Sequence, residues 1–265
     1  MAAVELRGVS VRFAGTSGAY TAIEHVDLDI GAGEFVCVVG PTGCGKSTLL
    51  NVVAGLAKPT AGEVRVAGVP LTGLNRAAGY LFQTDALMPW ASARDNVAAG
   101  LLFRGVARAQ ALTQADDWLG RVGLRGAGDR YPHQLSGGMK KRVALAQTLV
   151  LDPKILLMDE PFSALDVQTR SLMENELLGL WAADRKSVLF VTHDLDEAIA
   201  LGDRVIVMSA GPGSRPVASH PIDLPRPRDV AEARMSPRFV ELQRALWQSL
   251  RVEVQKSQRA MAAAG

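Results

Sequence analysis

The segment that most constrains this chain spans residues 40–47 and reads GPTGCGKS. It follows an apolar run at 35–39, short enough for a buried strand, and it precedes a helix-forming run at 48–53. Glycines at this spacing let successive backbone N–H groups point at phosphate oxygens, and the start of a helix adds a positive end. The segment therefore predicts a nucleoside triphosphate site, with Lys46 on the β- and γ-phosphates and the Ser47 hydroxyl on Mg²⁺.

Composition argues against several other functions. The chain has 265 residues, enough for one large domain or two joined lobes, and a net charge of +2. Its 29 basic residues are scattered and only 5% of its residues are aromatic, so we expect no nucleic-acid partner. We also expect no secretion signal and no membrane span, because no apolar run approaches the ~18 residues that a spanning helix needs. Cys37 and Cys44 fall in the expected strand and loop, which fits a reducing cytosol.

The order of the expected elements indicates an α/β fold. Most runs before residue 91 are strand-like, and helical spacing takes over between 91 and 150. Strands then alternate with helices, which is typical of a parallel sheet with crossover helices, so the helical block reads as an insertion. The expected strands are 4–13, 22–30, 35–39, 62–68, 79–82, 155–158, 188–191 and 205–208, and the expected helices are 48–53, 95–104, 108–122, 137–150, 167–183 and 196–201.

Regular structure is expected to become sparse after Gly211. The segment 224–228, LPRPR, should be stiff and extended. A final helix is predicted from about 238 to 255, with one apolar face that packs on the core or, as the alternative, docks a partner. The prolines that interrupt this region are Pro212, Pro216, Pro221, Pro225 and Pro227, and the apolar face consists of Phe239, Leu242, Leu246 and Leu250.

The segment 155–160, ILLMDE, is an apolar run that ends in two acids. A carboxylate at the end of a strand beside a phosphate loop is suited to hold Mg²⁺, so Asp159 is a candidate metal ligand. Glu160 is then placed to orient or deprotonate an attacking water. A solvated strand end is the alternative, and the apolar run before the acids and the proline after them disfavour it.

A second glycine-rich segment, LSGGM at 135–139, precedes another helix-forming run. Its Ser136 and two glycines, Gly137 and Gly138, predict a second anion site at a helix N-terminus. One copy of the chain has no obvious use for two phosphate cradles on a single nucleotide. Two copies arranged head to tail do, because each would place Ser136 on the γ-phosphate that Lys46 of the other copy holds.

With Gln83 after the strand at 79–82 and His193 after the strand at 188–191, the chain resembles the ATP-binding subunits of ABC transporters over about residues 4–210. The resemblance implies an α/β fold: a P-loop NTPase (RecA-like) core, an N-terminal antiparallel β subdomain and an inserted α-helical subdomain.

The same resemblance implies a division of the chain. The ATP-binding core with its β subdomain is expected at 1–83 and 151–210. The helical subdomain that carries the signature is expected at 84–150, and a C-terminal extension with a terminal helix at 211–265.

Carried over motif by motif, the resemblance gives the site residues their roles. Asp159 becomes the Walker B ligand of Mg²⁺, shared with Ser47 and Gln83, and Glu160 becomes the catalytic glutamate. His193 becomes the switch histidine that senses the γ-phosphate, and it joins Glu160 and Gln83 in the catalytic set. The residues expected on ATP are Phe13, Gly40, Pro41, Thr42, Gly43, Cys44, Gly45, Lys46, Ser47, Thr48, Ser136, Gly137, Gly138 and Asp166.

Two details of the match stay open. Phe13 is expected to stack on adenine, with Tyr20 as the competing candidate. The signature ends in Met139 where the family usually has glutamine, and Gln147 and Thr148 stand where an arginine–alanine pair is usual. Met139 should be tolerated, because the expected contacts come from the signature serine and backbone amides.

Within the family the chain is most similar to importer subunits for nitrate, sulfonates and taurine. The residues that carry this likeness are 81–90 (LFQTDALMPW), the LSGGM ending and 224–228. It implies ATP and Mg²⁺ as cofactors, an ATP-dependent homodimer, an integral membrane permease and, indirectly, a solute-binding protein. The expected location is the cytoplasmic face of the cell membrane, as a peripheral subunit.

The loop after Gln83 is expected to meet a short helix of the permease through Met88, Pro89 and Trp90, with core packing of Trp90 as the alternative. Two other functions stay possible at this point. One is a soluble ABC ATPase that is not coupled to transport, and the other is a nucleotide-gated regulator that does not hydrolyse ATP.

Overall fold

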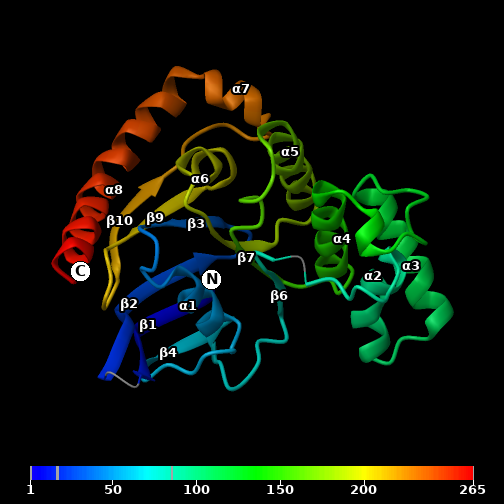
Figure 1. Ribbon diagram of the computed structural model, residues 1–265, viewed down its shortest axis with the longest axis horizontal. Coiled ribbons are helices and arrows are strands. Elements are labelled where there is room, and N and C mark those ends of the chain that lie inside the picture. Colours follow the sequence, from blue (N-terminus) through cyan, green and yellow to red (C-terminus); the bar gives the residue numbers. More distant parts are fainter. Residues whose placement is uncertain (1, 16–17, 85, 265) are drawn as a thin grey trace.

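Two sheets organise the part of the chain that the computed structural model describes, which is residues 2–15, 18–84 and 86–264. The first is a four-stranded antiparallel sheet of order β2-β1-β4-β5, and the second is a six-stranded sheet of order β10-β9-β3-β8-β7-β6 (Figure 1). The strands are β1 (Ala2–Gly15), β2 (Gly18–Gly31), β3 (Phe35–Val39), β4 (Ala61–Val66), β5 (Val69–Pro70), β6 (Ala78–Leu81), β7 (Ile155–Asp159), β8 (Ser187–Val191), β9 (Arg204–Met208) and β10 (Pro216–Pro221).

The central strand β3 is buried on both faces, as its continuous apolar sequence predicts. Phe35, Cys37 and Val39 belong to one hydrophobic cluster, and Val36 and Val38 belong to the other. This alternation follows from the period of two in a strand. Helix α1 (Lys46–Val53) and the antiparallel sheet cover one face, while α5 (Val167–Asp184) and α6 (Leu195–Leu201) cover the other.

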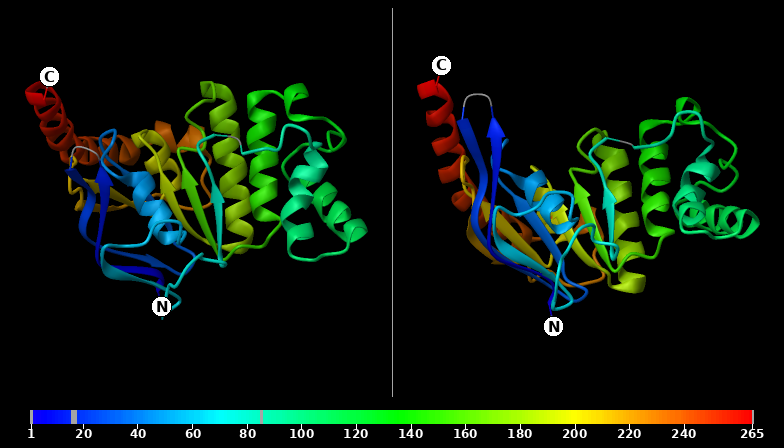
Figure 2. Two further views of the ribbon diagram at one scale, coloured as in Figure 1. Left: turned by 60° about the horizontal axis from the view of Figure 1, so that its bottom comes forward. Right: turned by 90° about the horizontal axis from the view of Figure 1, so that it is seen from below.

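The inserted helices lie at one end of the molecule, beside β6 (Figure 1, Figure 2). They are α2 (Ala93–Phe103), α3 (Arg108–Arg121) and α4 (Gly137–Leu149), with a short 3₁₀ turn at Pro132–Gln134. Helix α2 begins at Ala93, two residues before the predicted start, because the Ser92 hydroxyl accepts a hydrogen bond from the backbone N–H of Asp95.

The junction between α4 and β6 explains one departure from the family pattern. A Cβ on Gly79 of β6 would lie 2.7 Å from the Thr148 methyl group, so this pair fits only because residue 79 has no side chain. The Thr148 hydroxyl donates to the Ala144 carbonyl at 2.9 Å, which satisfies it inside the packed junction. No contact in the structure explains Gln147.

The prediction of sparse structure after Gly211 is wrong. Strand β10 pairs antiparallel with β9, and a further helix, α7 (Val230–Met235), precedes the terminal helix α8 (Pro237–Ala264). Prolines begin and end β10, which is tolerated because this strand lies at the edge of its sheet and, among the described residues, pairs with another strand of that sheet on one side only. The terminal helix is also longer than predicted.

The apolar face of α8 packs on the core, as predicted. Phe239, Leu242, Leu246 and Leu250 are all buried in the same cluster as β3 and α6. The helix contacts α6, β9 and β10, so it covers the end of the sheet farthest from the inserted helices (Figure 1, Figure 2). The extension is therefore part of the packed fold.

The LPRPR segment attaches the extension to the end of α6. The Arg228 guanidinium donates to the carbonyls of Gly202 at 2.6 Å and Ala200 at 3.2 Å, which α6 leaves without helical partners. Arg226 donates to Asp203 at 2.8 Å and stacks over the Trp181 ring at 4.1 Å. Burial lowers the pKa of Arg228 to about 10, so it stays a cation at neutral pH.

We predict that Leu246→Ala lowers the free energy of unfolding by about 2–5 kcal/mol, because Leu246 is 0% exposed and its removal leaves a cavity. Denaturant titration of the full chain measures this change. The matched control is Trp247→Ala on the same helix, which should cost less because Trp247 is 51% exposed. Equal losses in the two variants would contradict the packing of this face.

Candidate functional site

The glycine-rich loop connects β3 to α1, as the sequence predicts. Gly45 has a φ of +89° and precedes the first residue of α1. A Cβ there would lie 2.7 Å from the Ile23 side chain and 2.9 Å from the Ala22 carbonyl oxygen, so only glycine fits. Cys44 is buried behind the loop and burial raises the pKa of its thiol, which is the behaviour of a small packed side chain.

Lys46 lies inside the loop. Its Nζ donates to the carbonyl oxygens of Gly40 at 2.9 Å and Pro41 at 3.1 Å, and the residue is buried. These bonds hold the ammonium group against the loop at the start of α1, a helix whose N-terminus has no side-chain cap. A polyphosphate placed there meets a cation and a helix N-terminus together.

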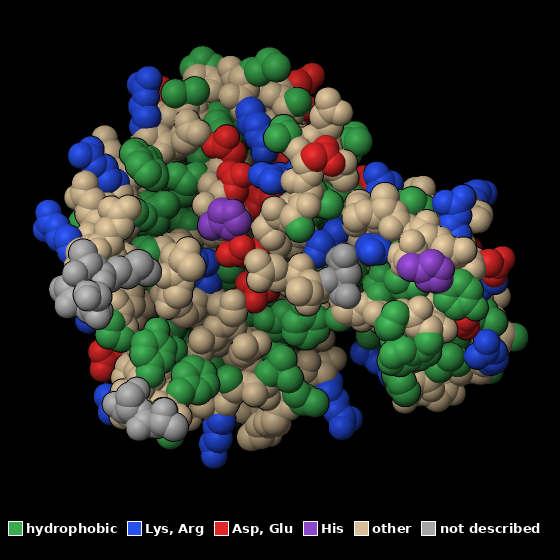
Figure 3. All heavy atoms as spheres, in the orientation of Figure 1, with side chains coloured by type: hydrophobic (Ala, Val, Ile, Leu, Met, Phe, Trp, Pro, Cys, Tyr) green, Lys and Arg blue, Asp and Glu red, His purple; other side chains and the backbone are tan. Residues whose placement is uncertain are grey.

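The loop forms one wall of a cleft of about 560 Å³. Residues from the β1–β2 hairpin, the loop and the ends of β6, β7 and β8 contribute to it, and acidic, basic and histidine side chains gather near the centre of the face in Figure 3. Its lining consists of Phe13, Tyr20, Ala22, Thr42, Gly43, Gly45, Lys46, Ser47, Thr48, Gln83, Glu160 and His193.

The proposed Mg²⁺ ligands fit a hard cation. The Ser47 hydroxyl hydrogen-bonds to Asp159, and burial raises the pKa of Asp159. The amide of Gln83 lies at the same cleft. Hydroxyl, carboxylate and amide oxygens are the ligand types that Mg²⁺ takes, and a bound cation would neutralise the negative charge of the half-buried Asp159 carboxylate.

The three proposed catalytic side chains meet at Glu160. Its Oε2 lies 2.9 Å from His193 Nδ1 and 3.4 Å from Gln83 Nε2. These residues come from the ends of three different strands, β7, β8 and β6, so only the folded sheet brings them together. Both contacts are made by Oε2 of Glu160. The other carboxylate oxygen, Oε1, can therefore accept a proton from water.

The backbone of Glu160 is also unusual. It has a φ of +44°, a left-handed conformation that non-glycine residues rarely adopt. Three hydrogen bonds hold it there: its N–H donates to the Val191 carbonyl at 2.8 Å, and its carbonyl accepts from the Ser163 hydroxyl at 3.0 Å and from the Ser163 N–H at 3.3 Å. Strain of this kind is concentrated at functional sites.

Seven predicted nucleotide residues do not line this cleft. Gly40, Pro41 and Cys44 belong to the phosphate loop itself, whereas Ser136, Gly137, Gly138 and Asp166 lie at the starts of α4 and α5. Ser136 caps α4 by accepting from the Met139 N–H at 3.3 Å, and Asp166 caps α5 by accepting from the Thr169 N–H at 3.0 Å. Both are exposed at the start of a helix. Neither residue therefore lines the phosphate cleft of its own copy of the chain.

Sequence reasoning missed Lys141. This buried lysine on α4 donates from Nζ to the backbone carbonyl of Gln83 at 2.6 Å. It ties the Gln83 loop to the helix that begins with the signature. A lysine in a helical run looks like a solvated face, so the sequence carried no signal for this contact.

The loop after Gln83 exposes its tryptophan. Trp90 is 76% exposed, so the alternative of core packing is wrong. Asn96 of α2 fixes the loop by accepting from the Met88 N–H at 2.7 Å and donating to the Met88 carbonyl at 3.1 Å. Asp85, which belongs to the segment 81–90, lies outside the described residues.

Comparison with known proteins places the chain in a family. Residues 23–163 match the family described as "ABC transporter". An uncharacterised ABC transporter ATP-binding protein of Methanocaldococcus jannaschii is 46% identical over 236 residues, which cover 89% of this chain and 86% of the relative. The Taurine import ATP-binding protein TauB of Burkholderia pseudomallei is 43% identical over 260 residues, which cover 97% of this chain and 100% of the relative.

A solved structure supports the same assignment. A dimeric ATP-binding cassette in a post-hydrolysis state, bound to ADP and Pi, superimposes with a TM-score of 0.75 at 32% identity, covering 83% of this chain and 99% of that one. The fold class predicted from the sequence is confirmed. The chain belongs to the ABC transporter family and is one of its ATP-binding, ATP-hydrolysing subunits.

Two aromatic rings stand at the cleft mouth, where Phe13 of β1 pairs across the hairpin with Tyr20 of β2. The Tyr20 hydroxyl donates to the Gly43 carbonyl at 3.3 Å, which holds that ring against the loop. The Phe13 ring has no polar atom and forms no such bond. We propose Phe13 as the ring that stacks on adenine.

We predict that Phe13→Ala weakens ATP binding by about 1–3 kcal/mol, the usual value of a base–aromatic stack. Titration calorimetry with the full chain and Mg²⁺ measures the affinity. Tyr20→Phe, which keeps the ring and removes only the bond to Gly43, is the matched control and should bind ATP nearly as well as the native chain. A larger loss in Tyr20→Ala than in Phe13→Ala would transfer the stacking role to Tyr20.

Proposed function

We propose that this chain powers the import of a small solute, of the taurine, sulfonate or nitrate type, through a separate membrane permease. The observation that carries the ATPase half is the meeting of Glu160, His193 and Gln83 beside the phosphate loop. The import half is supported by the 43% identity to a taurine import protein over nearly the whole length of both chains. A solute-binding protein that delivers the solute to the permease belongs to the same proposal.

The geometry suggests how hydrolysis would proceed. Backbone N–H groups of residues 42–48 and the Lys46 ammonium would bind the phosphates, and Ser47, Asp159 and Gln83 would hold Mg²⁺, which neutralises phosphate charge when bound. Glu160 would accept a proton from the attacking water. His193, which is hydrogen-bonded to the Glu160 carboxylate, would orient that carboxylate and contact the γ-phosphate.

The exposed Ser136 and Asp166 lead us to propose a head-to-tail homodimer. In that arrangement the N-terminus of α4 from one copy would close the phosphate cleft of the other, so that ATP lies between them. The similar cassette structure with ADP and Pi is dimeric. Hydrolysis and phosphate loss would then remove part of the contact surface and let the copies part.

We propose that the permease docks near the loop after Gln83. A groove of about 360 Å³ lies there between the loop and α2, and two large apolar side chains border it: Trp90, and Phe103, which is 87% exposed. Among the described residues no helix is long and apolar enough to cross a membrane. The likeness to a taurine import ATP-binding protein supports a place for the chain at the cytoplasmic face of the inner membrane, as a peripheral subunit.

We predict that Glu160→Gln lowers the rate of phosphate release about 10²- to 10⁴-fold, while ATP binding persists. Because ATP would then stay between the copies, gel filtration in ATP and Mg²⁺ should show a dimer, and in ADP a monomer. The double variant Glu160→Gln, Lys46→Ala is the control and should stay monomeric, since it lacks the phosphate cation. A monomer of the single variant in saturating ATP would rule out the homodimer, and unchanged phosphate release would rule out Glu160 as the base.

We predict that Trp90→Ser combined with Phe103→Ser prevents association with the permease. The tagged chain is purified from its native host in mild detergent, and a multi-span membrane protein should accompany the native chain but not the double variant. Val252→Ser, at a half-exposed position on α8 at the opposite end of the molecule, is the control and should keep the partner. Recovery of only soluble partners with the native chain would overturn the transport role and leave the ATPase role standing.

A further inference from the structure

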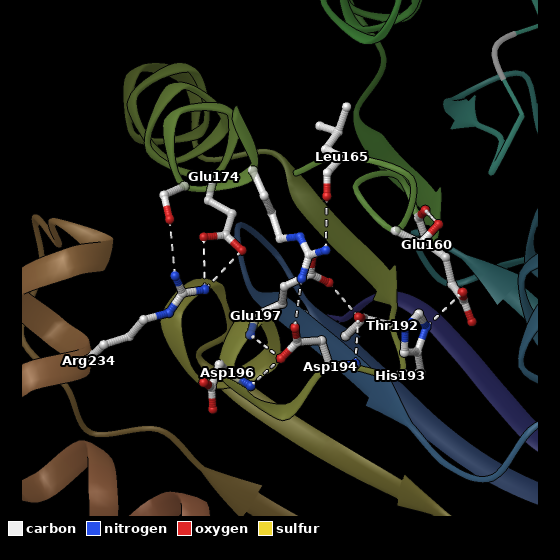
Figure 4. A network of polar contacts seen from close by, with 12 residues as sticks. Glu160, Leu165, Glu174, Thr192, His193, Asp194, Asp196, Glu197 and Arg234 are labelled. Atoms are coloured by element: carbon white, nitrogen blue, oxygen red, sulfur yellow. Dashed lines mark hydrogen bonds and ion pairs between the residues drawn. The ribbon is translucent and has the colours of Figure 1, made fainter. Parts of the chain in front are cut away.

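Arg170 joins the two loops that flank the hydrolysis site. It stands in the first turn of α5, and its two terminal nitrogens reach in different directions. Nη2 donates to the Leu165 carbonyl at 3.1 Å, and Nη1 donates to Asp194 Oδ2 at 3.1 Å. Figure 4 shows Leu165, Asp194, His193 and Glu160 grouped around this contact.

The Leu165 side of the contact belongs to the loop that follows Glu160. The Glu160 carbonyl accepts hydrogen bonds from both the N–H and the hydroxyl of Ser163, so residues 160–166 form one connected turn. Leu165 itself is buried, and its N–H donates to the Phe162 carbonyl at 3.1 Å. A bond to the Leu165 carbonyl therefore fixes the far end of the turn that begins at the catalytic glutamate.

The Asp194 side belongs to the loop that carries His193. Asp194 donates from its N–H to the Thr192 hydroxyl at 3.0 Å, and its Oδ1 accepts from the Asp196 N–H at 2.8 Å as the cap of α6. The Thr192 hydroxyl in turn donates to the buried Glu197. His193 thus stands between two anchored neighbours, and Arg170 holds one of them through the second carboxylate oxygen of Asp194.

We propose that Arg170 is a positioning residue, which sets His193 against Glu160 by fixing the loop that follows each of them. The inference rests on the proposed catalytic roles of Glu160 and His193. It needs the forked guanidinium: a lysine ammonium has no planar fork, and one end of the contact would be lost. Because hydrolysis demands close geometry, loosening these loops should slow the chemical step far more than ATP binding.

Arg234 provides a matched control, because it is an arginine of another helix that also binds α5. It reaches α5 from α7 and donates to Glu174 at 3.1 Å and to Ser171 at 3.1 Å. Its side chain is 25% exposed, against 24% for Arg170, so the two arginines are equally buried. Burial raises the pKa of Glu174 to about 7, so that carboxyl can bind a proton when its partner is removed.

The experiment compares Arg170→Gln, Arg170→Lys and Arg234→Gln in the full chain. ATP turnover gives kcat and KM, calorimetry gives ATP affinity, and thermal unfolding gives the midpoint. We expect kcat to fall about 10- to 100-fold in Arg170→Gln, and less in Arg170→Lys, with KM and affinity within about threefold of the native values. Arg234→Gln should lower the midpoint as much as Arg170→Gln and leave kcat near the native value.

Asp194→Asn tests the same contact from its other end. Asparagine keeps the cap of α6 but loses the charge that pairs with Arg170. The double variant Arg170→Gln, Asp194→Asn should be no slower than the slower single variant, because both remove one contact. If Arg170→Gln fails to fold, the fall in kcat is measured in Arg170→Lys and Asp194→Asn, which weaken the same contact.

Two results would overturn the inference: a native kcat in Arg170→Gln, or an equal loss of kcat in Arg234→Gln, which would make the effect one of stability. His193→Ala separates this inference from the proposed function. If His193→Ala loses activity and Arg170→Gln does not, only the role of Arg170 fails. A fully active His193→Ala would remove the role of His193 and this inference with it.

Discussion

The hydrolysis site depends on the register of the parallel strands. Asp159 at the end of β7 pairs with Val191 at the end of β8, and Val191 pairs with Val38 of β3, so three carboxyl ends reach the same edge of the sheet. The N–H of Glu160 extends this pairing to one more residue, by donating to the Val191 carbonyl. A slip of one residue in any of these strands would turn its side chains to the opposite face and separate the acids from the phosphate loop.

How much could be predicted from the sequence depends on how local each feature is. The phosphate loop and the pair Asp159 and Glu160 were predictable, because each motif lies within one strand and the residues next to it. The contacts of Lys141 with Gln83 and of Arg170 with Asp194 were not, because they join residues that only the tertiary fold brings together. A long basic side chain on a helix has no sequence pattern that distinguishes a buried tie from a solvated surface.

The C-terminal extension also contains structure that the sequence did not predict, because it depends on the tertiary fold. Proline counts argued against a strand at 216–221, yet an edge strand needs donors on one side only, and β10 pairs with β9 there. Arg226 and Arg228 then fasten the segment after β10 to the end of α6. Edge position is a property of the sheet and not of the segment, so single-sequence propensity could not reveal it.

In the proposed dimer, the residues offered to the second copy are already ordered in the first. The Ser136 hydroxyl and the Asp166 carboxylate are both bound to N–H groups at the start of their own helices, so neither has to be fixed when the copies meet. Immobilising side chains at an interface costs conformational entropy and weakens association, and caps that are already formed avoid that cost. At the start of α4, the N–H groups of Gly137 and Gly138 would be the donors that a phosphate takes in that dimer. Ordering within one copy and anion binding between two copies are thus consequences of the same helix starts.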